Sequence, residues 1–200
     1  MSGSFTTELF FSRIPPNQNA VFYIPGCKIE EATIEMRVGE PTKVTCTAWG
    51  QQMFTGSIVS GSIYQSDPGL NPFMWYDGLI QYTPLGGSTQ ILNNVTDARV
   101  RTRESLERVY NIQLNTNVVR VLQERGREID GELTFNFESF AELNELLNDT
   151  YFRLDLVLSA SAGATGSFYY CKWTDINYPT KPTDLIAFRA PFTATSGSLS

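Results

Sequence analysis

The sequence predicts a mainly β protein with one flanking α-helix. Apolar and polar residues alternate with a period of two in several separate segments, which is the pattern of half-buried strands. Only residues 139–148 combine a helical apolar face with a capping box, formed by Ser139 and Glu142. With 42% hydrophobic and 18% charged residues, the 200-residue chain has a globular composition. We therefore expect residues 1–200 to form a single domain of two packed antiparallel sheets, a sandwich or partial barrel.

A hairpin is predicted over residues 28–49, because two alternating runs flank the turn segment Gly-Glu-Pro-Thr at residues 39–42. Each run has one apolar and one polar face, as in a sheet that packs on a core with one side only. The apolar faces consist of Ala32, Ile34, Met36 and Val38 in the first run and Val44, Cys46 and Ala48 in the second. Residues 1–26, before the hairpin, are predicted to be an N-terminal arm with a short strand at residues 20–24.

Residues 50–94 form a long region of loops and short strands, with strand candidates at residues 56–64 and 77–83. At its tip, large apolar residues gather beside prolines. Such a cluster either packs under the domain or contacts a partner, and the sequence leaves both open. Long ordered loops in compact domains are usually functional. The candidate contact residues are Leu70, Pro72, Phe73, Met74, Trp75 and Tyr76.

The segment from Asp97 to Leu158 carries the strongest strand signals. Strands are expected at residues 95–103, 128–137 and 152–159, with two shorter apolar runs at residues 107–112 and 117–122. The helix at residues 139–148 falls between the second and third of these strands. Further strands are expected at residues 168–173 and 185–195, and residues 196–200 are predicted to be a loose tail.

Composition excludes several kinds of site. The chain has no histidine, which removes the commonest metal ligand and the commonest acid–base group near neutral pH. Its three cysteines are too few and too widely spaced for a disulfide framework or a zinc site, and Cys46 and Cys171 are expected to be buried in strands. No phosphate-binding glycine motif occurs. We expect no catalytic residue, no cofactor and no metal.

The net charge of −6 argues against a surface that grips nucleic acid, because phosphate-binding surfaces are usually basic. Arg99, Arg101 and Arg103 nevertheless share one strand face. They form either a phosphate-contacting ladder or, as we favour for an acidic chain, a surface that pairs with acidic residues of a neighbouring strand or subunit. The first residues lack a signal-peptide pattern and no apolar run has membrane-spanning length, so we expect the chain to fold in a reducing cytoplasm.

Several pieces of the chain resemble the tail tube proteins of long-tailed bacteriophages. The segment PFMWYDGLI, residues 72–80, resembles the stretch before the family's central strand, and ARVRTRESLERVYNI, residues 98–112, resembles that strand and its polar turn. REIDGELTFNFES, residues 127–139, is similar to the strand that leads into the flanking helix. LIAFRAPFTAT, residues 185–195, is similar to the closing strand. The order of these pieces, together with the lack of catalytic residues, makes the resemblance fairly specific.

The resemblance implies a virion structural protein that forms homohexameric rings, stacked into a hollow tube with an inner β-barrel through which genomic DNA travels. It implies localisation to the virion tail, with assembly in the host cytoplasm. The implied partners are other copies of the chain and the tape measure, tail terminator and baseplate proteins, with sheath proteins left open. The family's lumen is commonly acidic, whereas the polar strand faces here are mixed. The candidate lumen residues are Thr33, Glu35, Arg37, Lys43, Thr45, Thr47, Arg99, Arg101, Glu132, Thr134 and Asn136.

Two alternatives stay open at the level of sequence. The first is a tube protein of a phage-tail-like particle or secretion system, which shares this architecture. The second belongs to another class, a β-sandwich carbohydrate-binding module with Trp75 and Tyr76 as an exposed aromatic platform. That module would be a monomer that binds glycan, whereas a tube protein self-associates.

Overall fold

The structure is a computed structural model that describes residues 5–11, 20–56, 72–110, 119–136, 150–159, 163–175 and 187–199. In these ranges the chain forms twelve strands and one short 3-10 helix, η1 (Trp75–Asp77). The strands are β1 (Phe5–Phe11), β2 (Ala20–Arg37), β3 (Lys43–Trp49), β4 (Phe54–Gly56), β5 (Leu79–Pro84), β6 (Gln90–Ile91), β7 (Val95–Tyr110), β8 (Val119–Asn136), β9 (Phe152–Ser159), β10 (Ala164–Trp173), β11 (Ala187–Ala194) and β12 (Ser196–Leu199). No helix in the described ranges is long and apolar enough to cross a membrane.

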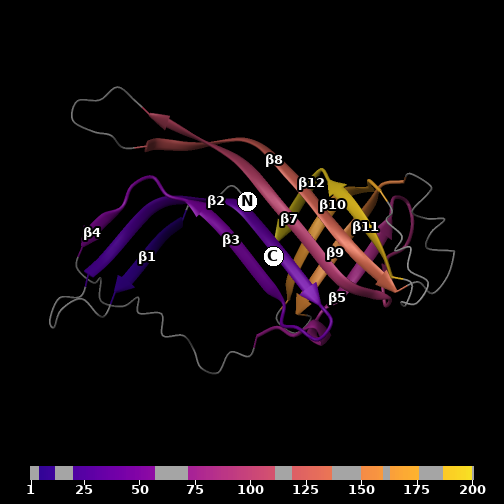
Figure 1. Cartoon of the computed structure of the whole chain (residues 1–200). Coiled ribbons are helices and arrows are strands. Elements are labelled where there is room, and N and C mark those ends of the chain that lie inside the picture. Colours follow the sequence, from indigo (N-terminus) through magenta and orange to yellow (C-terminus); the bar gives the residue numbers. More distant parts are fainter. Residues whose placement is uncertain are drawn as a thin grey trace. The chain divides into compact units, whose positions relative to one another are not determined.

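The described strands join one sheet in the order β1-β2-β7-β8-β11-β10-β9-β5-β6, with β3 and β4 paired to β2 and β12 paired to β10 (Figure 1). The predicted mainly antiparallel β structure is confirmed. One continuous path replaces the two separate sheets that we expected. The chain divides into two compact units, residues 1–31, 46–71 and 104–126, and residues 32–45, 72–103 and 127–200, which are described in turn.

In the first unit, long strands continue where the sequence predicted breaks. Within the apolar runs predicted at residues 107–112 and 117–122, residues 107–110 belong to β7 and residues 119–122 belong to β8, and both strands extend through polar residues; residues 111–112 and 117–118 lie outside the described residues. Charged side chains are satisfied there by neighbours: Lys28 Nζ lies 2.8 Å from Glu124 Oε1, and Arg125 pairs with Glu107. The Arg108 guanidinium lies 4.6 Å from the centre of the Trp49 ring. These contacts across strands stabilise the polar stretches that separate the apolar runs from the predicted strands.

The hydrophobic core of the second unit lies between two parts of its strand path. Residues of β2, β7, β8 and β11 contribute one side, and residues of β5, β9 and β10 contribute the other. In Figure 1, β9 and β10 lie behind β8 and β11. Aromatic rings join the two sides, since Phe152 of β9 meets Phe192 of β11 at 6.1 Å between centroids and Phe135 of β8 meets Trp173 of β10 at 6.3 Å. Each strand therefore has one face on the core and one face away from it.

Several predictions about individual elements are corrected. Residues 196–199 of the predicted loose tail form β12, which pairs with β10 in the register Ser196↔Tyr169 to Leu199↔Gly166. The N-terminal arm contains β1, paired with the start of β2. The strand candidate at residues 56–64 begins at β4, and its residues 57–64 lie outside the described residues. The predicted helix at residues 139–148 also lies outside them.

The hairpin at residues 28–49 is confirmed, but β3 is not half-buried as its alternation predicts. Six of its seven residues are exposed, and Val44 is 53% exposed. Cys46 is likewise exposed, whereas Cys171 is buried as predicted. Burial raises the pKa of the Cys171 thiol to about 12, so that thiol stays protonated near neutral pH. Val38 is exposed because β2 ends at Arg37 and the turn begins.

Candidate functional site

A charged surface covers the side of β2, β7, β8 and β11 that faces away from the core of the second unit. Its residues alternate with buried ones: Asp97, Arg99 and Arg101 flank Ala98 and Val100, which are each 1% exposed. The period of two therefore places acids and bases of four neighbouring strands on one face. We call this surface the paired-charge face. It consists of Glu35, Arg37, Asp97, Arg99, Arg101, Asp130, Glu132 and Arg189.

Every charge on this face lies beside an opposite one on an adjacent strand. Arg99 Nε lies 3.2 Å from Glu35 Oε1, and Arg37 Nε lies 3.5 Å from Asp97 Oδ2, which links β2 to β7. Two further pairs link β7 to β8 and β8 to β11. They join Arg101 to Asp130 at 3.2 Å and Arg189 to Glu132 at 3.9 Å. The preferred interpretation of the arginine ladder is thus confirmed for Arg99 and Arg101, which pair with acids of neighbouring strands.

Not all predicted lumen residues lie on the paired-charge face. Thr33 is buried, and so are its neighbours Ala32 and Ile34. Burial of successive residues means that β2 is covered on both faces at this point. Lys43, Thr45 and Thr47 are exposed on β3. Thr134 and Asn136 continue the alternation of β8 and are partly buried.

The sequence prediction also missed Asp97, Asp130 and Arg189. Asp97 and Asp130 each lie two residues from another residue of the paired-charge face on the same strand. Arg189 lies between two buried residues of β11. Their period-two position is therefore the signal that identifies them.

Asp97 is the one member of the paired-charge face whose pKa departs from its ordinary value in a resolved direction. Partial burial raises the pKa of its carboxyl, and the nearby Glu35 acts in the same direction, while Arg37 opposes both. The raised pKa means that the ionised carboxylate is less favourable in the folded chain than in the unfolded chain. Its destabilising effect is therefore present at neutral pH and disappears as the pH falls through the folded-state pKa.

Replacing Asp97 with asparagine should remove this pH-dependent effect. We expect the difference in unfolding free energy, Asp97→Asn minus wild type, to become more positive between pH 4 and pH 7. The reason is that residue 97 ionises over that range only in the wild type. Urea denaturation at several pH values measures it. Thr96→Ala is the control, since it changes an uncharged neighbour and should give a difference that does not vary with pH. A difference that becomes more negative toward pH 7 would mean that the Arg37 pair outweighs the burial of Asp97.

A second surface is the aromatic segment, residues 72–76, which precedes β5. Trp75 is 40% and Tyr76 is 65% exposed, and their rings meet edge to face with centroids 5.8 Å apart. The backbone beneath them is held in place: the Thr42 amide donates to the Phe73 carbonyl at 2.8 Å, and the Met74 amide donates to Asp77 Oδ2 at 2.8 Å. The segment thus presents large apolar rings on a fixed support. Leu70, the remaining candidate, lies outside the described residues.

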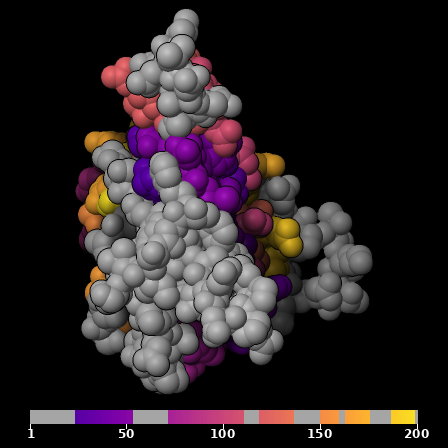
Figure 2. Space-filling model, turned by 90° about the vertical axis from the view of Figure 1, so that its left-hand side faces the viewer, coloured from indigo at the N-terminus to yellow at the C-terminus, as the bar shows by residue number. Residues whose placement is uncertain are grey.

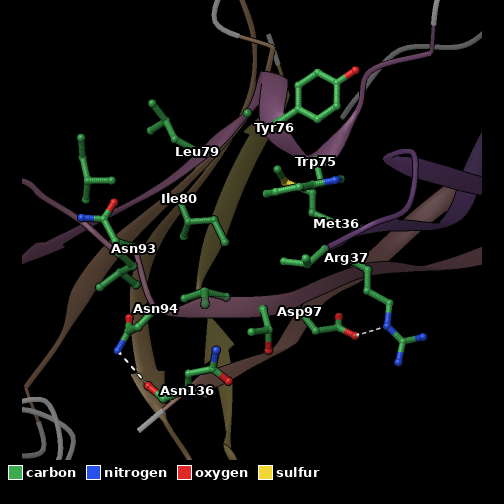
Figure 3. A pocket seen from close by; sticks show the side chains of 16 residues that line it. Met36, Arg37, Trp75, Tyr76, Leu79, Ile80, Asn93, Asn94, Asp97 and Asn136 are labelled. Carbon is green, nitrogen blue, oxygen red and sulfur yellow. Dashed lines mark hydrogen bonds and ion pairs between the residues drawn. The ribbon is translucent and has the colours of Figure 1, made fainter. Parts of the chain in front are cut away.

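A groove of about 510 Å³ runs beside the aromatic segment (Figure 3). Trp75 lies above Met36 on one side of it, and Leu79 and Ile80 lie on the other. The far end is polar, where Arg37 points toward Asp97.

The comparison that decides the family is a match to a model described as "Phage tail tube protein", which covers residues 2–196. The chain belongs to the phage tail tube protein family. The resemblance noted in the sequence is therefore confirmed, and this tail tube protein is a structural subunit of the virion tail. No curated protein matches it.

The tail tube protein is also similar to several solved structures. A chain from the tail of an empty gene transfer agent particle with C6 symmetry is 13% identical, with a TM-score of 0.47 over 62% of this chain and 95% of that chain. The SPP1 tail tube gives 11% identity and a TM-score of 0.48, over 64% and 79% of the two chains. A sheath/tube terminator of an extracellular contractile injection system is 14% identical, with a TM-score of 0.45 over 66% of this chain and 99% of that chain.

Proposed function

We propose that this tail tube protein forms homohexameric rings that stack into a hollow tube, with the paired-charge face lining the channel. The observation that carries the proposal is the composition of that face. It is fully polar, lies opposite the core, and balances Arg37, Arg99, Arg101 and Arg189 against four carboxylates. Because each guanidinium has a carboxylate within 4.0 Å, the face should hold phosphate weakly. Genomic DNA then passes without specific binding, and the protein acts by assembly rather than catalysis.

The lateral contact in the ring is assigned to β3. This strand pairs with β2 in the described sheet, and most of its residues are exposed on both faces. In Figure 2, atoms in the violet colours of the residues that include β3 are visible at the surface. An exposed strand with apolar residues such as Val44 and Cys46 invites pairing with another chain, and ring closure provides that pairing in a controlled way. Lys43, Thr45 and Thr47 would then extend the channel wall.

The axial contact between rings is assigned to the aromatic segment, whose exposed rings are typical of the energetic centre of a protein interface. The ends of the tube would contact the tape measure, terminator and baseplate proteins. A tube in a phage-tail-like particle or injection system would use the same surfaces. Neighbouring genes distinguish that case from a phage tail.

Electron microscopy of the purified full-length chain tests the proposal. We expect rings with six subunits and tubes built from them. Maleimide-gold attached to Thr134→Cys in a Cys46→Ser background should appear along the tube axis, because Thr134 lies two residues from Glu132 and therefore on the same face of β8. The Cys46→Ser substitution removes an exposed thiol that would also react. A chain that stays monomeric in all buffers would refute the tube. Gold at the tube exterior would refute the assignment of the channel face.

A further inference from the structure

The turn between β2 and β3, residues 38–42, lies next to the paired-charge face, the start of β3 and the aromatic segment. Glu40 connects the first two, because its Oε1 lies 3.6 Å from Nη1 of Arg37 on the paired-charge face and its Oε2 lies 2.8 Å from Nζ of Lys43 in β3. The aromatic segment is joined to the same turn through backbone contacts. We call residues 38–42 the junction turn.

Two backbone contacts join the junction turn to the aromatic segment. The Thr42 amide donates to the Phe73 carbonyl at 2.8 Å, and Pro41 forms an antiparallel bridge with Met74. The ion pairs of Glu40 lie at the surface, where such pairs contribute little to stability. The backbone contacts therefore carry most of the connection between the turn and the segment.

The two ends of the aromatic segment are held by different parts of the second unit. Just beyond its C-terminal end, Gly78 lies so close to β9 that a Cβ atom there would be 2.3 Å from the Val157 carbonyl oxygen. This end is therefore placed by a strand of the hydrophobic core. Near its N-terminal end, the segment is held by the junction turn. Trp75 and Tyr76 lie between these two supports, so a movement of the turn changes how their rings are presented.

β3 has little support of its own in a single chain. It starts at Lys43, directly after the junction turn, and β2 is its one neighbour among the described strands. Six of its seven residues are exposed. Strands with few buried contacts open more readily than the rest of a domain. Because Thr42 precedes β3 directly, opening of β3 also loosens the contact between the Thr42 amide and the Phe73 carbonyl.

We propose that the junction turn couples the two contacts of the tube. Pairing of β3 with another copy of this chain stabilises the closed form of β3, since binding to one form of a chain shifts the population toward it. The turn then holds the aromatic segment in the geometry that stacking requires. Thr42 is a positioning residue in this scheme, because it acts through Phe73 rather than by contact with another subunit. The inference rests on the proposed function, from which it takes the lateral contact at β3 and the axial contact at the aromatic segment.

Hydrogen exchange in the Trp75→Ser/Tyr76→Ser variant tests the coupling, because this variant should form rings without tubes. The exchange of residues 72–78 is measured by mass spectrometry in dilute monomers and in rings. The amides of Met74 and Asp77 donate hydrogen bonds inside the segment. We expect their exchange to slow by about tenfold or more on ring formation, although neither lies in β3.

Equal exchange of residues 72–78 in monomers and rings would overturn the coupling and leave the proposed function intact. Failure of the wild-type chain to form rings at any concentration would instead refute the lateral contact, and the coupling would fall with it. The two failures are therefore told apart by microscopy of the same samples.

Two substitutions at position 42 isolate the contact with Phe73. Thr42→Pro removes the amide donor, whereas Thr42→Val keeps it and removes a buried hydroxyl that has no hydrogen-bond partner in the described part of the chain. We expect Thr42→Pro to form rings and to raise the concentration needed for tubes by about three- to tenfold, the effect of one lost hydrogen bond. In the serine background, its residues 72–78 should exchange as fast in rings as in monomers. Thr42→Val should match the wild type in both measurements.

Leu85→Pro is the matched control for the loss of a surface amide. The Leu85 amide donates to the Tyr151 carbonyl at 2.9 Å, and like Thr42 this residue follows a proline. Its substitution should leave the concentration needed for tubes unchanged. Tubes of Thr42→Pro at the wild-type concentration would overturn the role of Thr42. If Thr42→Pro does not fold, the exchange measurement on Trp75→Ser/Tyr76→Ser still decides the coupling.

Discussion

Replacing Phe152 with alanine is expected to lower the free energy of unfolding by about 3–5 kcal/mol, the usual cost of removing a large aromatic side chain from a core. Phe152 is 2% exposed. Its ring centroid lies 4.5 Å from that of Trp173, 4.9 Å from Tyr82 and 6.1 Å from Phe192. It therefore joins β9 to β5, β10 and β11. Truncation leaves a cavity that three large rings cannot fill by small movements, because cores are close-packed.

Urea denaturation of the purified chain measures this loss, and Leu85→Ala serves as the control. Leu85 is 69% exposed, so its truncation should change the unfolding free energy by no more than about 0.5 kcal/mol. Because domains are stable by only about 5–15 kcal/mol, Phe152→Ala should also reduce the yield of tubes at 37 °C. A loss below about 1 kcal/mol would show that the two sides of the core do not depend on this ring.

Alternation predicted the core of the second unit well. Leu133 and Phe135 of β8 and Leu154, Leu156 and Leu158 of β9 are buried as their period of two requires. Their burial was predicted correctly because a second layer covers the strands on which they lie. The same pattern in β3 failed, since Val44 and Cys46 have no such cover in the single chain. Alternation reports an apolar face, and the sequence does not say whether the same chain or another copy covers it.

The paired-charge face was also predictable only in part. Strand faces were predictable, so the arginines of β7 could be placed on one side of the sheet before the structure was known. Their partners Glu35 and Asp130 lie on other strands, and strand order is not contained in any local pattern. The positive φ of Tyr170 was equally hidden, because tyrosine is an ordinary strand residue and carries no turn signal.

Replacing Trp75 and Tyr76 together with serine should abolish tubes and leave folded rings. Both side chains are exposed, and the backbone under them is held by main-chain contacts, including the amide of Asp77 donating to the Met74 carbonyl at 2.9 Å. The unfolding free energy should therefore change by at most about 1 kcal/mol. An aromatic anchor contributes about 2 kcal/mol or more to an interface, which is roughly 30-fold in affinity. In a ring this loss is repeated at each subunit.

Negative-stain microscopy and size-exclusion chromatography together separate the possible results. The matched control is Tyr110→Ser, which removes an exposed tyrosine of β7 outside the aromatic segment and should leave tube length unchanged. Tubes of normal length from Trp75→Ser/Tyr76→Ser would place the axial contact elsewhere on the subunit. A fall of several kcal/mol in unfolding free energy would instead make the segment part of the fold. Rings without tubes would support the assignment of the axial contact to Trp75 and Tyr76. Lateral pairing through β3 does not require these two side chains, so the rings should still form.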